Sequence, residues 1–355
     1  MTRATVLIPS HDHGALLGLA AASALAQSVA DLEVFIVLDG ADPETAAAAR
    51  SLADDDSRVQ VFVNPKGERH GEAHRHRALE EARGRIIYYL SDDDLWFPDH
   101  VEYLEGLLED ADFAHSLPAV VGSDGALRTP HVGDLTDPSH RELITRGRNF
   151  IPLSTAAHTL AAYRSLPEGW TPAPAGLPTD LHMWQKFVAA PEVRLTSGGR
   201  PTVLRFPTPA RIDMGLDERL SELTSWRERI GDAEGRASIR LAVFESLASE
   251  TATHRARSLR LESLLEQARH DLDESKEALA NTRSELEELV EIGRRKAELE
   301  AELAQTHDRQ SELEDRLAAI QGSIAYRASR RLARVPVVRS IGRWVGRALA
   351  GRGDR

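Results

Sequence analysis

Three consecutive carboxylates, Asp92, Asp93 and Asp94, stand just after the apolar run Arg85–Leu90. Hard divalent cations such as Mg²⁺ and Mn²⁺ prefer oxygen ligands and keep part of their coordination shell for water or phosphate oxygens. Carboxylates held rigidly after a buried strand can fix such an ion against a diphosphate and offset the charge of a departing nucleoside diphosphate. The alternative is an acidic turn that caps the next helix. We expect a Mn²⁺ or Mg²⁺ site here.

Two other apolar runs end in residues that can hold a nucleotide. Asp39 follows the run Leu32–Leu38, and its carboxylate can accept hydrogen bonds from a base or from a ribose hydroxyl. His11 follows the run that ends at Pro9, and its ring can stack on a base. The competing interpretation of the segment around Asp39 is an ordinary turn ahead of a helix.

The segment Lys66–Arg77 is rich in arginine and histidine. A guanidinium binds phosphate oxygens through paired hydrogen bonds, which makes Arg75 a candidate ligand for a diphosphate. His70, His74 and His76 raise the question of a zinc site, but their order does not match the H-E-x-x-H motif and no fourth ligand is evident. For most of these histidines we expect a solvated polar face.

Apolar runs alternate with helical patterns in the first part of the chain. The expected strands are Ala4–Pro9, Leu32–Leu38, Val59–Val63 and Arg85–Leu90, and the expected helices are Ala15–Gln27, Ala41–Asp54 and Glu72–Arg83. This alternation predicts an α/β fold with a mostly parallel sheet that helices cover on both faces. Ligands of such folds bind beyond the carboxyl ends of the strands, where the candidate residues stand. From Pro118 to Pro209 the pattern weakens, and we expect short strands and loops.

Composition and charge limit the class of protein. The 355 residues include no cysteine, which excludes disulfides, iron–sulfur clusters, Cys-ligated zinc and a thiol nucleophile. The net charge is −12, yet residues 322–355 carry nine Arg and one Asp. This distribution argues against nucleic-acid binding and favours one anionic contact at the C-terminus. The uncharged run 14–30 lacks the flanks of a signal peptide, and no run reaches the ~18 apolar residues of a membrane span, so we expect a cytoplasmic protein.

From about Asp217 the composition changes to glutamate, arginine, leucine and alanine. Apolar residues then recur mostly at multiples of 3.5, including Leu261, Leu265, Leu272, Leu279, Leu286 and Leu289. This pattern predicts a long α-helical coiled coil and a homo-oligomer, whereas the alternative is a single solvated helix with i,i+4 ion pairs.

Beyond the predicted coiled coil, Ser323–Ala350 carries arginines on one face and apolar residues on the other. Such a basic amphipathic tail suits an anionic membrane surface, or alternatively the acidic body of the protein.

In combination, four segments resemble family 2 glycosyltransferases of the GT-A fold. They are Val-Leu-Ile-Pro-Ser-His-Asp, Ser-Ala-Leu-Ala-Gln-Ser, Phe-Ile-Val-Leu-Asp-Gly and Tyr-Leu-Ser-Asp-Asp-Asp-Leu-Trp-Phe-Pro. The likeness is close over residues 4–105 and looser to about 215. It implies a Rossmann-like GT-A domain that performs an inverting, metal-dependent transfer of a sugar. The donor would be a nucleotide-diphosphate sugar, with a UDP-sugar favoured, and the acceptor a glycan or a lipid-linked molecule in cell-surface polysaccharide synthesis.

The resemblance also implies roles for individual residues. Its base-contacting aspartate corresponds to Asp39, the residue that lines the base corresponds to His11 next to Pro9, and an arginine of its third-strand helix corresponds to Arg75. Its metal motif falls on the aspartate triplet, with Asp93 and Asp94 as metal ligands and Asp92 on the nucleotide side.

The family further implies a general base from the acceptor half of the domain. Thr179-Asp180-Leu181-His182-Met183-Trp184 resembles the family's Glu-Asp element with threonine in place of glutamate. An inverting transfer needs a carboxylate that deprotonates the acceptor hydroxyl opposite the departing diphosphate, and Asp180 is the candidate catalytic base. The alternative is that Asp180 caps a helix over Leu181–Ala189. His182 is a second candidate for the base.

Two departures support a second hypothesis. Leu38 replaces the first Asp of the Asp-Asp-Gly turn, and Ser91 stands where the metal motif often begins. They slightly favour a non-catalytic coiled-coil scaffold with a degenerate GT-A head at the membrane, whereas the intact aspartate triplet and Asp180 disfavour it. A nicotinamide-dependent oxidoreductase also fits the alternation, but no G-x-G-x-x-G follows the first strand. We therefore expect a glycosyltransferase domain over 1–215, a coiled coil over 216–321 and a basic tail over 322–355, peripheral on the inner face of the plasma membrane.

Overall fold

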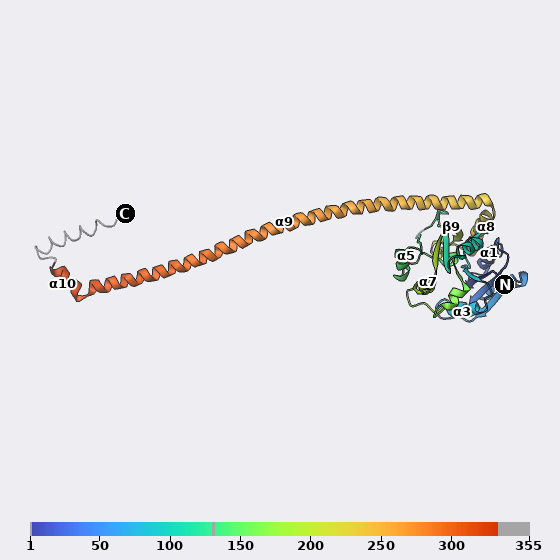
Figure 1. Cartoon of the computed structure of the whole chain (residues 1–355), viewed down its shortest axis with the longest axis horizontal. Coiled ribbons are helices and arrows are strands. Elements are labelled where there is room, and N and C mark those ends of the chain that lie inside the picture. The colour runs from blue at the N-terminus through green and yellow to red at the C-terminus, as the bar shows by residue number, and fades with distance from the viewer. Residues whose placement is uncertain (1, 130–131, 333–355) are drawn as a thin grey trace. The chain divides into compact units, whose positions relative to one another are not determined.

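The computed structural model describes residues 2–129 and 132–332 (Figure 1). The chain divides into two units, Met1–Arg257 and Ser258–Arg355. All the described strands belong to the first unit. The described part of the second consists of most of helix α9 (Ala233–Gly322) and of α10 (Ile324–Leu332). The first unit therefore continues past residue 215, where we expected the glycosyltransferase-like domain to end.

One nine-stranded sheet forms the centre of the first unit, in the order β3-β2-β1-β4-β8-β6-β9-β5 with β7 beside β6. Its strands are β1 (Ala4–Ser10), β2 (Leu32–Asp39), β3 (Val59–Asn64), β4 (Ile86–Tyr89), β5 (Leu95–Trp96), β6 (Phe113–Val121), β7 (Leu127–Arg128), β8 (Ala156–Thr159) and β9 (Leu195–Arg205). β1 to β4 pair in parallel, which confirms the predicted order of strands and helices in this half. β8 runs antiparallel to both β4 and β6, so the mostly parallel sheet also contains antiparallel pairs.

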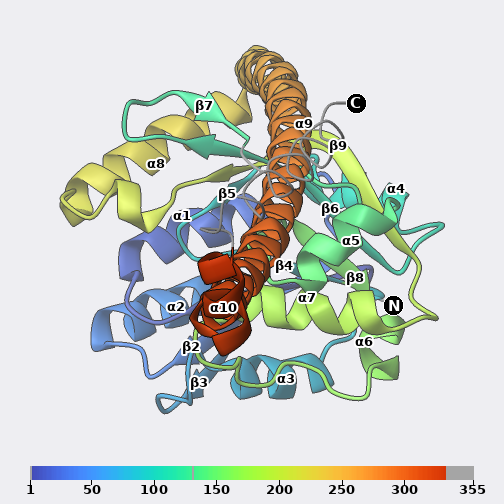
Figure 2. The same ribbon diagram turned by 90° about the vertical axis from the view of Figure 1, so that its left-hand side faces the viewer.

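Helices cover both faces of the parallel half (Figure 2). They include α1 (Gly14–Leu25), α2 (Pro43–Asp55), α3 (Glu72–Glu80), α4 (His100–Leu107), α5 (Pro138–Thr145), α6 (Leu160–Ser165) and α7 (Thr179–Ala189). Val6 and Ile8 of β1 belong to one buried cluster with α1, α2 and α4, while Leu7 belongs to another with α3, α6 and α7. Successive strand side chains point to opposite faces, so a continuously apolar strand such as β1 packs against both helix layers.

The weakly patterned region holds longer elements than the sequence predicted. β9 has 11 residues, and its parallel pairing with β6 aligns Phe113 with Leu195 and Ala119 with Leu204. Gly198, Gly199 and Pro201 interrupt its apolar alternation, which explains why no long strand was expected there. The pairing shifts register beside Leu117, where β9 accommodates this irregular stretch.

A third buried cluster joins the C-terminal part of the first unit to the sheet. It unites Leu95, Phe97, Leu204 and Phe206 with α8 (Leu216–Gly231) and with the start of α9. The helices contribute Leu223, Trp226, Ile230, Ile239 and Val243 to this cluster. α8 is therefore part of the same hydrophobic core and not the beginning of a separate helical domain.

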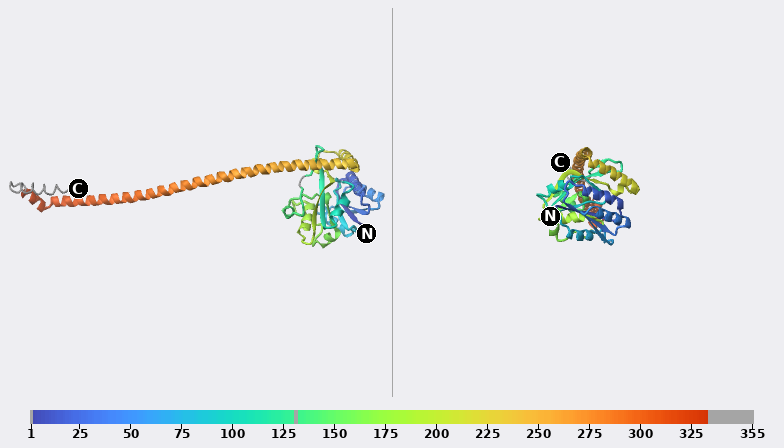
Figure 3. Two further views of the ribbon diagram at one scale, coloured as in Figure 1. Left: turned by 45° about the horizontal axis from the view of Figure 1, so that its top comes forward. Right: turned by 90° about the vertical axis from the view of Figure 1, so that its right-hand side faces the viewer.

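Helix α9 runs without interruption for 90 residues (Figure 3). Along it, Leu265, Leu272, Leu279 and Leu286 repeat at seven-residue intervals and are 53%, 54%, 70% and 60% exposed. A long helix with an apolar seam fits the predicted coiled coil. Of the expected tail, α10 is described, and residues 333–355 lie outside the described part. No helix within the described residues is both long and apolar enough to cross a membrane.

The buried histidine of α4 gives a test of this packing. His100 is fully buried and stacks on Trp96, its Nδ1 lies 2.8 Å from Thr202 Oγ1, and burial lowers its pKa to about 3. When the pH falls below the ordinary histidine pKa of about 6.5, the unfolded chain gains a proton at this residue and the folded chain does not, so folding stability is lost.

His100→Asn should therefore flatten the pH dependence of stability. We expect the free energy of unfolding to lose about 2 kcal/mol less than in the parent protein between pH 6.5 and 5. Urea unfolding of both proteins at the two pH values measures this difference, and comparison with the parent removes the effects of all other titrating groups. An identical pH dependence for the two proteins would show that His100 is not held neutral by its surroundings.

Candidate active site

A pocket of about 270 Å³ opens at the carboxyl ends of β1, β2 and β4. Six of the residues singled out in the sequence line it: Pro9, His11, Asp39, Arg75, Asp92 and Asp93. Because β1 lies between β2 and β4 in parallel register, the loops that follow these strands meet at one edge of the sheet. Asp94 and Asp180 do not appear among the described residues that line this pocket.

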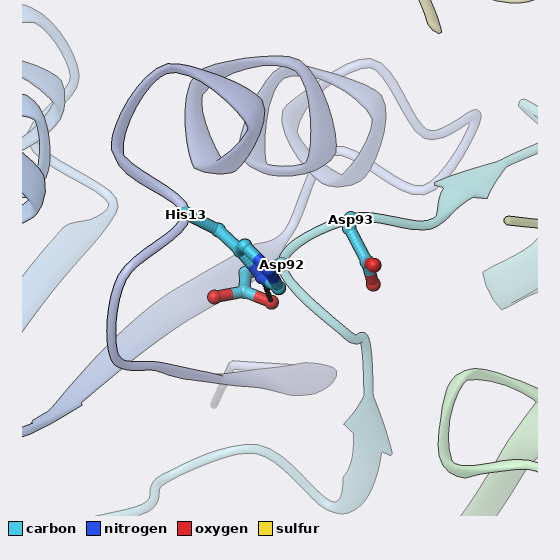
Figure 4. A group of neighbouring side chains, drawn as sticks. All are labelled: His13, Asp92 and Asp93. Carbon is cyan, nitrogen blue, oxygen red and sulfur yellow. Dashed lines mark hydrogen bonds and ion pairs between the residues drawn. The ribbon is translucent and has the colours of Figure 1, made fainter. Parts of the chain in front are cut away.

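His13, Asp92 and Asp93 form a group that could hold a metal ion (Figure 4). One ligand atom from each of them lies within 4.8 Å of the others. His13 Nδ1 lies 2.9 Å from Asp92 Oδ1, and this hydrogen bond raises the pKa of His13. One imidazole nitrogen and two carboxylate oxygens suit Mn²⁺ and leave positions for water or phosphate oxygens. In the described part of the chain, no other cluster of this kind is present.

The histidine of this group was missed in the sequence. His13 lies in the loop after β1, 79 positions before Asp92. The parallel pairing of β1 with β4 brings the two together. Parallel neighbours place their following loops side by side. Only the order of the strands, which the sequence does not state, shows that β1 and β4 are neighbours.

Asp93 is buried among other carboxylates. Burial, together with the nearby carboxylates of Asp94 and Asp92, raises the pKa of Asp93 to about 7. The Nη2 group of Arg219, in α8, donates a hydrogen bond to Asp93 Oδ2 at 3.2 Å. Carboxylates crowded in this way favour the binding of a cation, because its charge offsets their mutual repulsion.

Asp94 points to a different set of partners. Its carboxylate accepts hydrogen bonds from Ser154 Oγ at 2.5 Å and from the backbone N–H of Phe206 at 3.0 Å. Burial raises the pKa of Asp94. These bonds tie the loop after β4 to the end of β9. The structure brings Asp92 and Asp93 to the group around His13, but among the described residues it does not bring Asp94 there.

Asp39 is held as a charged acceptor at the end of β2. Burial works to raise its pKa, but hydrogen bonds from Lys66 and from Gly67 N, which lies 2.6 Å from Asp39 Oδ1, lower it overall. His11 approaches the same point, with Nδ1 2.8 Å from the Asp39 carbonyl oxygen. Gly40 is required here, since its φ is +63° and a Cβ would meet the Lys66 backbone at 2.8 Å.

The two departures from the family pattern have different surroundings. Leu38 is fully buried in the core cluster beneath α1 and α2. Its side chain therefore packs in the core, and Leu38 is not among the residues that line the pocket. Ser91 does line the pocket, and its backbone N–H donates to Ser154 Oγ at 3.0 Å. The departure at position 38 is therefore accommodated by hydrophobic packing.

Arg75 is a buried cation with spare hydrogen-bonding capacity. Its guanidinium lies 5.0 Å from the Trp170 ring centroid, and Nη2 donates to the His70 carbonyl oxygen at 3.0 Å. Within the described residues Nε is buried and has no partner. Burial lowers the pKa of Arg75. A buried guanidinium with an unused donor suits an anion.

The neighbouring histidines do not gather into a zinc site. His74 Nε2 lies 3.0 Å from the Pro65 carbonyl oxygen, and His76 Nδ1 lies 2.7 Å from the Tyr163 hydroxyl. These two rings therefore form hydrogen bonds with different partners and do not converge on one point. His70 lines the pocket beside Arg75.

Asp180 lies in the first turn of α7, after the N-cap residue Pro178, and its Oδ1 accepts a hydrogen bond from the backbone N–H of Leu181 at 2.8 Å. Burial raises the pKa of Asp180. Its neighbour Thr179 donates to Glu72 Oε1 at 2.9 Å, which fastens the start of α7 to the helix that carries Arg75. The structure therefore places Asp180 on a fixed helix end, and its catalytic role remains a prediction.

Residues 5–166 match the family model described as Glycosyl transferase family 2. They are a family 2 glycosyltransferase domain. The chain is 28% identical over 94 residues to GalNAc(5)-diNAcBac-PP-undecaprenol beta-1,3-glucosyltransferase of Campylobacter jejuni, with 26% of this chain and 30% of that protein covered. It is also 28% identical over 98 residues to an uncharacterized glycosyltransferase of Haemophilus influenzae, with 28% and 39% covered. The chain thus spans less than half the length of these two relatives.

Solved structures of glycosyltransferases cover a larger share of the chain at lower identity. Staphylococcus aureus TarS 1–349 in complex with UDP-GlcNAc is 14% identical, with 69% of this chain and 71% of that chain covered and a TM-score of 0.45. The mannosyltransferase PcManGT from Pyrobaculum calidifontis, in complex with GDP-Man and Mn²⁺, is 17% identical, with 72% and 80% covered and a TM-score of 0.39.

Proposed function

We propose that the family 2 domain transfers a sugar from a nucleotide-diphosphate donor, with a UDP-sugar favoured, to a glycan or lipid-linked acceptor in cell-surface polysaccharide synthesis. The observation that carries the proposal is the single pocket that joins Asp39, Arg75 and the His13–Asp92–Asp93 group. These residues supply an acceptor for a base or ribose, a cation for phosphate, and carboxylates for a divalent metal.

Different residues of the pocket would bind different parts of the donor. His11 and Asp39 would hold the nucleoside, since both line the pocket and His11 Nδ1 lies 2.8 Å from the Asp39 carbonyl oxygen. Arg75 would bind the diphosphate. His13, Asp92 and Asp93 would hold Mn²⁺ or Mg²⁺, which when bound supplies positive charge for the leaving nucleoside diphosphate. Asp94 would hold the loop after β4 in place through its hydrogen bonds with Ser154 and Phe206.

Asp180 would act as the general base of an inverting transfer. Its carboxylate would take the proton of the acceptor hydroxyl while that oxygen attacks the anomeric carbon and the bond to the diphosphate breaks. Support comes from its place at the start of α7, tied through Thr179 and Glu72 to the helix that also carries Arg75. A raised pKa makes the carboxylate a stronger base once it is deprotonated.

Titration calorimetry tests this function directly. UDP, GDP and dTDP are added to the purified protein with and without Mn²⁺. Binding of one nucleoside diphosphate that strengthens with Mn²⁺ is the expected result. Failure of all three to bind would contradict the proposal and favour the scaffold hypothesis.

The name of a relative and the charge of the C-terminal tail support a lipid-linked acceptor. The name of the Campylobacter relative gives it a substrate linked through diphosphate to undecaprenol, a membrane lipid. We propose that residues 322–355, with nine Arg, hold this protein at an anionic membrane surface near such an acceptor.

The protein should sediment with vesicles that contain anionic lipid, and a protein that lacks residues 322–355 should remain in the supernatant. Equal sedimentation of the two proteins would rule out the tail as the membrane contact.

We also propose that α9 makes the protein a homo-oligomer. The leucines at 265, 272, 279 and 286 share one heptad position and are more than half exposed, as expected for one strand of a coiled coil. Leu272→Asp combined with Leu279→Asp should convert the oligomer to a monomer in analytical ultracentrifugation. Ser284→Asp adds one aspartate two positions before Leu286, away from this seam, and should leave the oligomer intact. A monomeric parent protein would refute the coiled coil.

A further inference from the structure

Arg219 of α8, which the sequence did not single out, contacts Asp93 of the pocket wall without lining the pocket itself. Its Nη2 group donates to Asp93 Oδ2 at 3.2 Å, and each of the two side chains is 12% exposed. The Arg219 Nε atom is buried and, among the described residues, has no hydrogen-bond partner. A guanidinium has five N–H donors, and leaving them unsatisfied inside a protein is unfavourable. Arg219 is thus equipped to bind an anion with several oxygens.

The helix that carries Arg219 is held firmly against the first unit. The buried Arg211 side chain pairs with Glu222 through two hydrogen bonds of 2.6 Å, and Glu222 lies one turn after Arg219. Leu223 and Trp226 of the same helix are buried in the core cluster that contains Phe97 and Leu204. These contacts fix the rotation and position of α8, so Arg219 is presented to Asp93 by a rigid element.

Arg219 and a metal ion would compete for the same carboxylate. Asp93 belongs to the group whose ligand atoms lie within 4.8 Å of one another, and Arg219 already donates to its Oδ2 atom. A divalent ion bound to Asp93 would repel the guanidinium at this distance. A diphosphate that arrives with the ion offers Arg219 new acceptors, because its oxygens lie beside the metal that they ligate.

We propose that Arg219 binds the diphosphate of the donor and pairs with Asp93 only while metal and diphosphate are absent. This inference rests on the proposed function, since it assumes a nucleoside diphosphate in the pocket. It places a diphosphate ligand outside residues 5–166, on a helix that follows the family 2 domain. α8 is then part of the donor site and not a connection to α9.

Arg219→Ala tests the inference by calorimetry of the full chain. With Mn²⁺ present, the variant should bind UDP about 10- to 100-fold more weakly, because it loses a charge-assisted hydrogen bond. Its affinity for uridine, measured by ligand-observed NMR, should not change. Without nucleotide, Mn²⁺ should bind more tightly to the variant, because Asp93 is released. Arg219→Lys should keep part of the UDP affinity, and Arg227→Ala, an exposed arginine of the same helix, should match the parent.

The outcomes separate the two proposals. If the parent binds UDP and Arg219→Ala binds it equally well, Arg219 is no ligand of the diphosphate and the inference is wrong. Equal losses for UDP and uridine would also overturn it, because they would indicate a structural role. If the parent binds none of UDP, GDP and dTDP, the proposed function itself fails. The Mn²⁺ titration needs no nucleotide, and an unchanged Mn²⁺ affinity in Arg219→Ala would overturn the competition for Asp93.

Discussion

Asp93→Asn is expected to lower metal-dependent sugar transfer by about 10²- to 10³-fold, which corresponds to several kcal/mol of lost charge stabilisation. The substitution keeps the size of the side chain but removes the negative charge that would hold the ion. It also removes the partner of Arg219. Initial rates of donor turnover at increasing Mn²⁺ concentration measure the effect. The midpoint of the Mn²⁺ dependence should move to a higher concentration together with the loss of rate.

Asp94→Asn is the matched comparison for this prediction. The Asp94 carboxylate accepts hydrogen bonds from Ser154 and from the backbone of Phe206. The substitution should therefore lower the unfolding temperature and leave the Mn²⁺ dependence of the rate close to that of the parent. Equal Mn²⁺ dependences for Asp93→Asn and the parent would contradict the metal site. A shift of the Mn²⁺ dependence in Asp94→Asn but not in Asp93→Asn would assign the ion to the other carboxylate.

Asp180→Asn is expected to lower kcat by about 10²- to 10⁴-fold, the usual contribution of a general base. Asparagine occupies the same place but cannot accept the proton of the acceptor hydroxyl. The affinity for UDP should remain that of the parent, because Asp180 is not among the described residues that line the nucleotide pocket. Transfer rates and UDP titrations of the same preparation measure both quantities. A kcat close to the parent value would remove Asp180 from the mechanism.

The pH dependence of kcat gives a second test of Asp180. The base must be deprotonated, so the rate should fall as the pH drops through its pKa. Because burial raises that pKa, the fall should occur at a higher pH than for an exposed aspartate. The residual activity of Asp180→Asn should lose this step. His182→Gln should keep both the rate and the step, and the opposite result would assign the base to His182.

The sequence was sufficient where local patterns determine structure. β1 and β2 are largely apolar runs that end in polar residues, so their positions and the candidates His11 and Asp39 could be predicted together. Asp92 and Asp93 were found for the same reason, at the end of β4. In each case the strand and the site residue are neighbours in the chain, and parallel pairing then brings the strand ends to one pocket.

The rest of the site depends on contacts between distant segments. His13 meets Asp92 across 79 positions, and Arg219 reaches Asp93 across 126 positions. Neither contact has a pattern in the chain that would identify it. α8 was assigned to a helical region because its composition resembles that of α9. Its burial through Trp226 and Leu223 against the sheet becomes visible only when the order of the strands is known.

The release of nucleoside diphosphate from nucleotide sugars tests the central claim most directly. The purified protein is incubated with UDP-glucose, UDP-N-acetylglucosamine or GDP-mannose in Mn²⁺, and the free nucleoside diphosphate is measured without added acceptor, so that water takes the sugar. We predict slow release from one donor class that stops when Mn²⁺ is chelated and that is lost in Asp93→Asn. No release from any donor, together with no nucleotide binding, would contradict the account and leave the coiled coil and the tail as the functional parts.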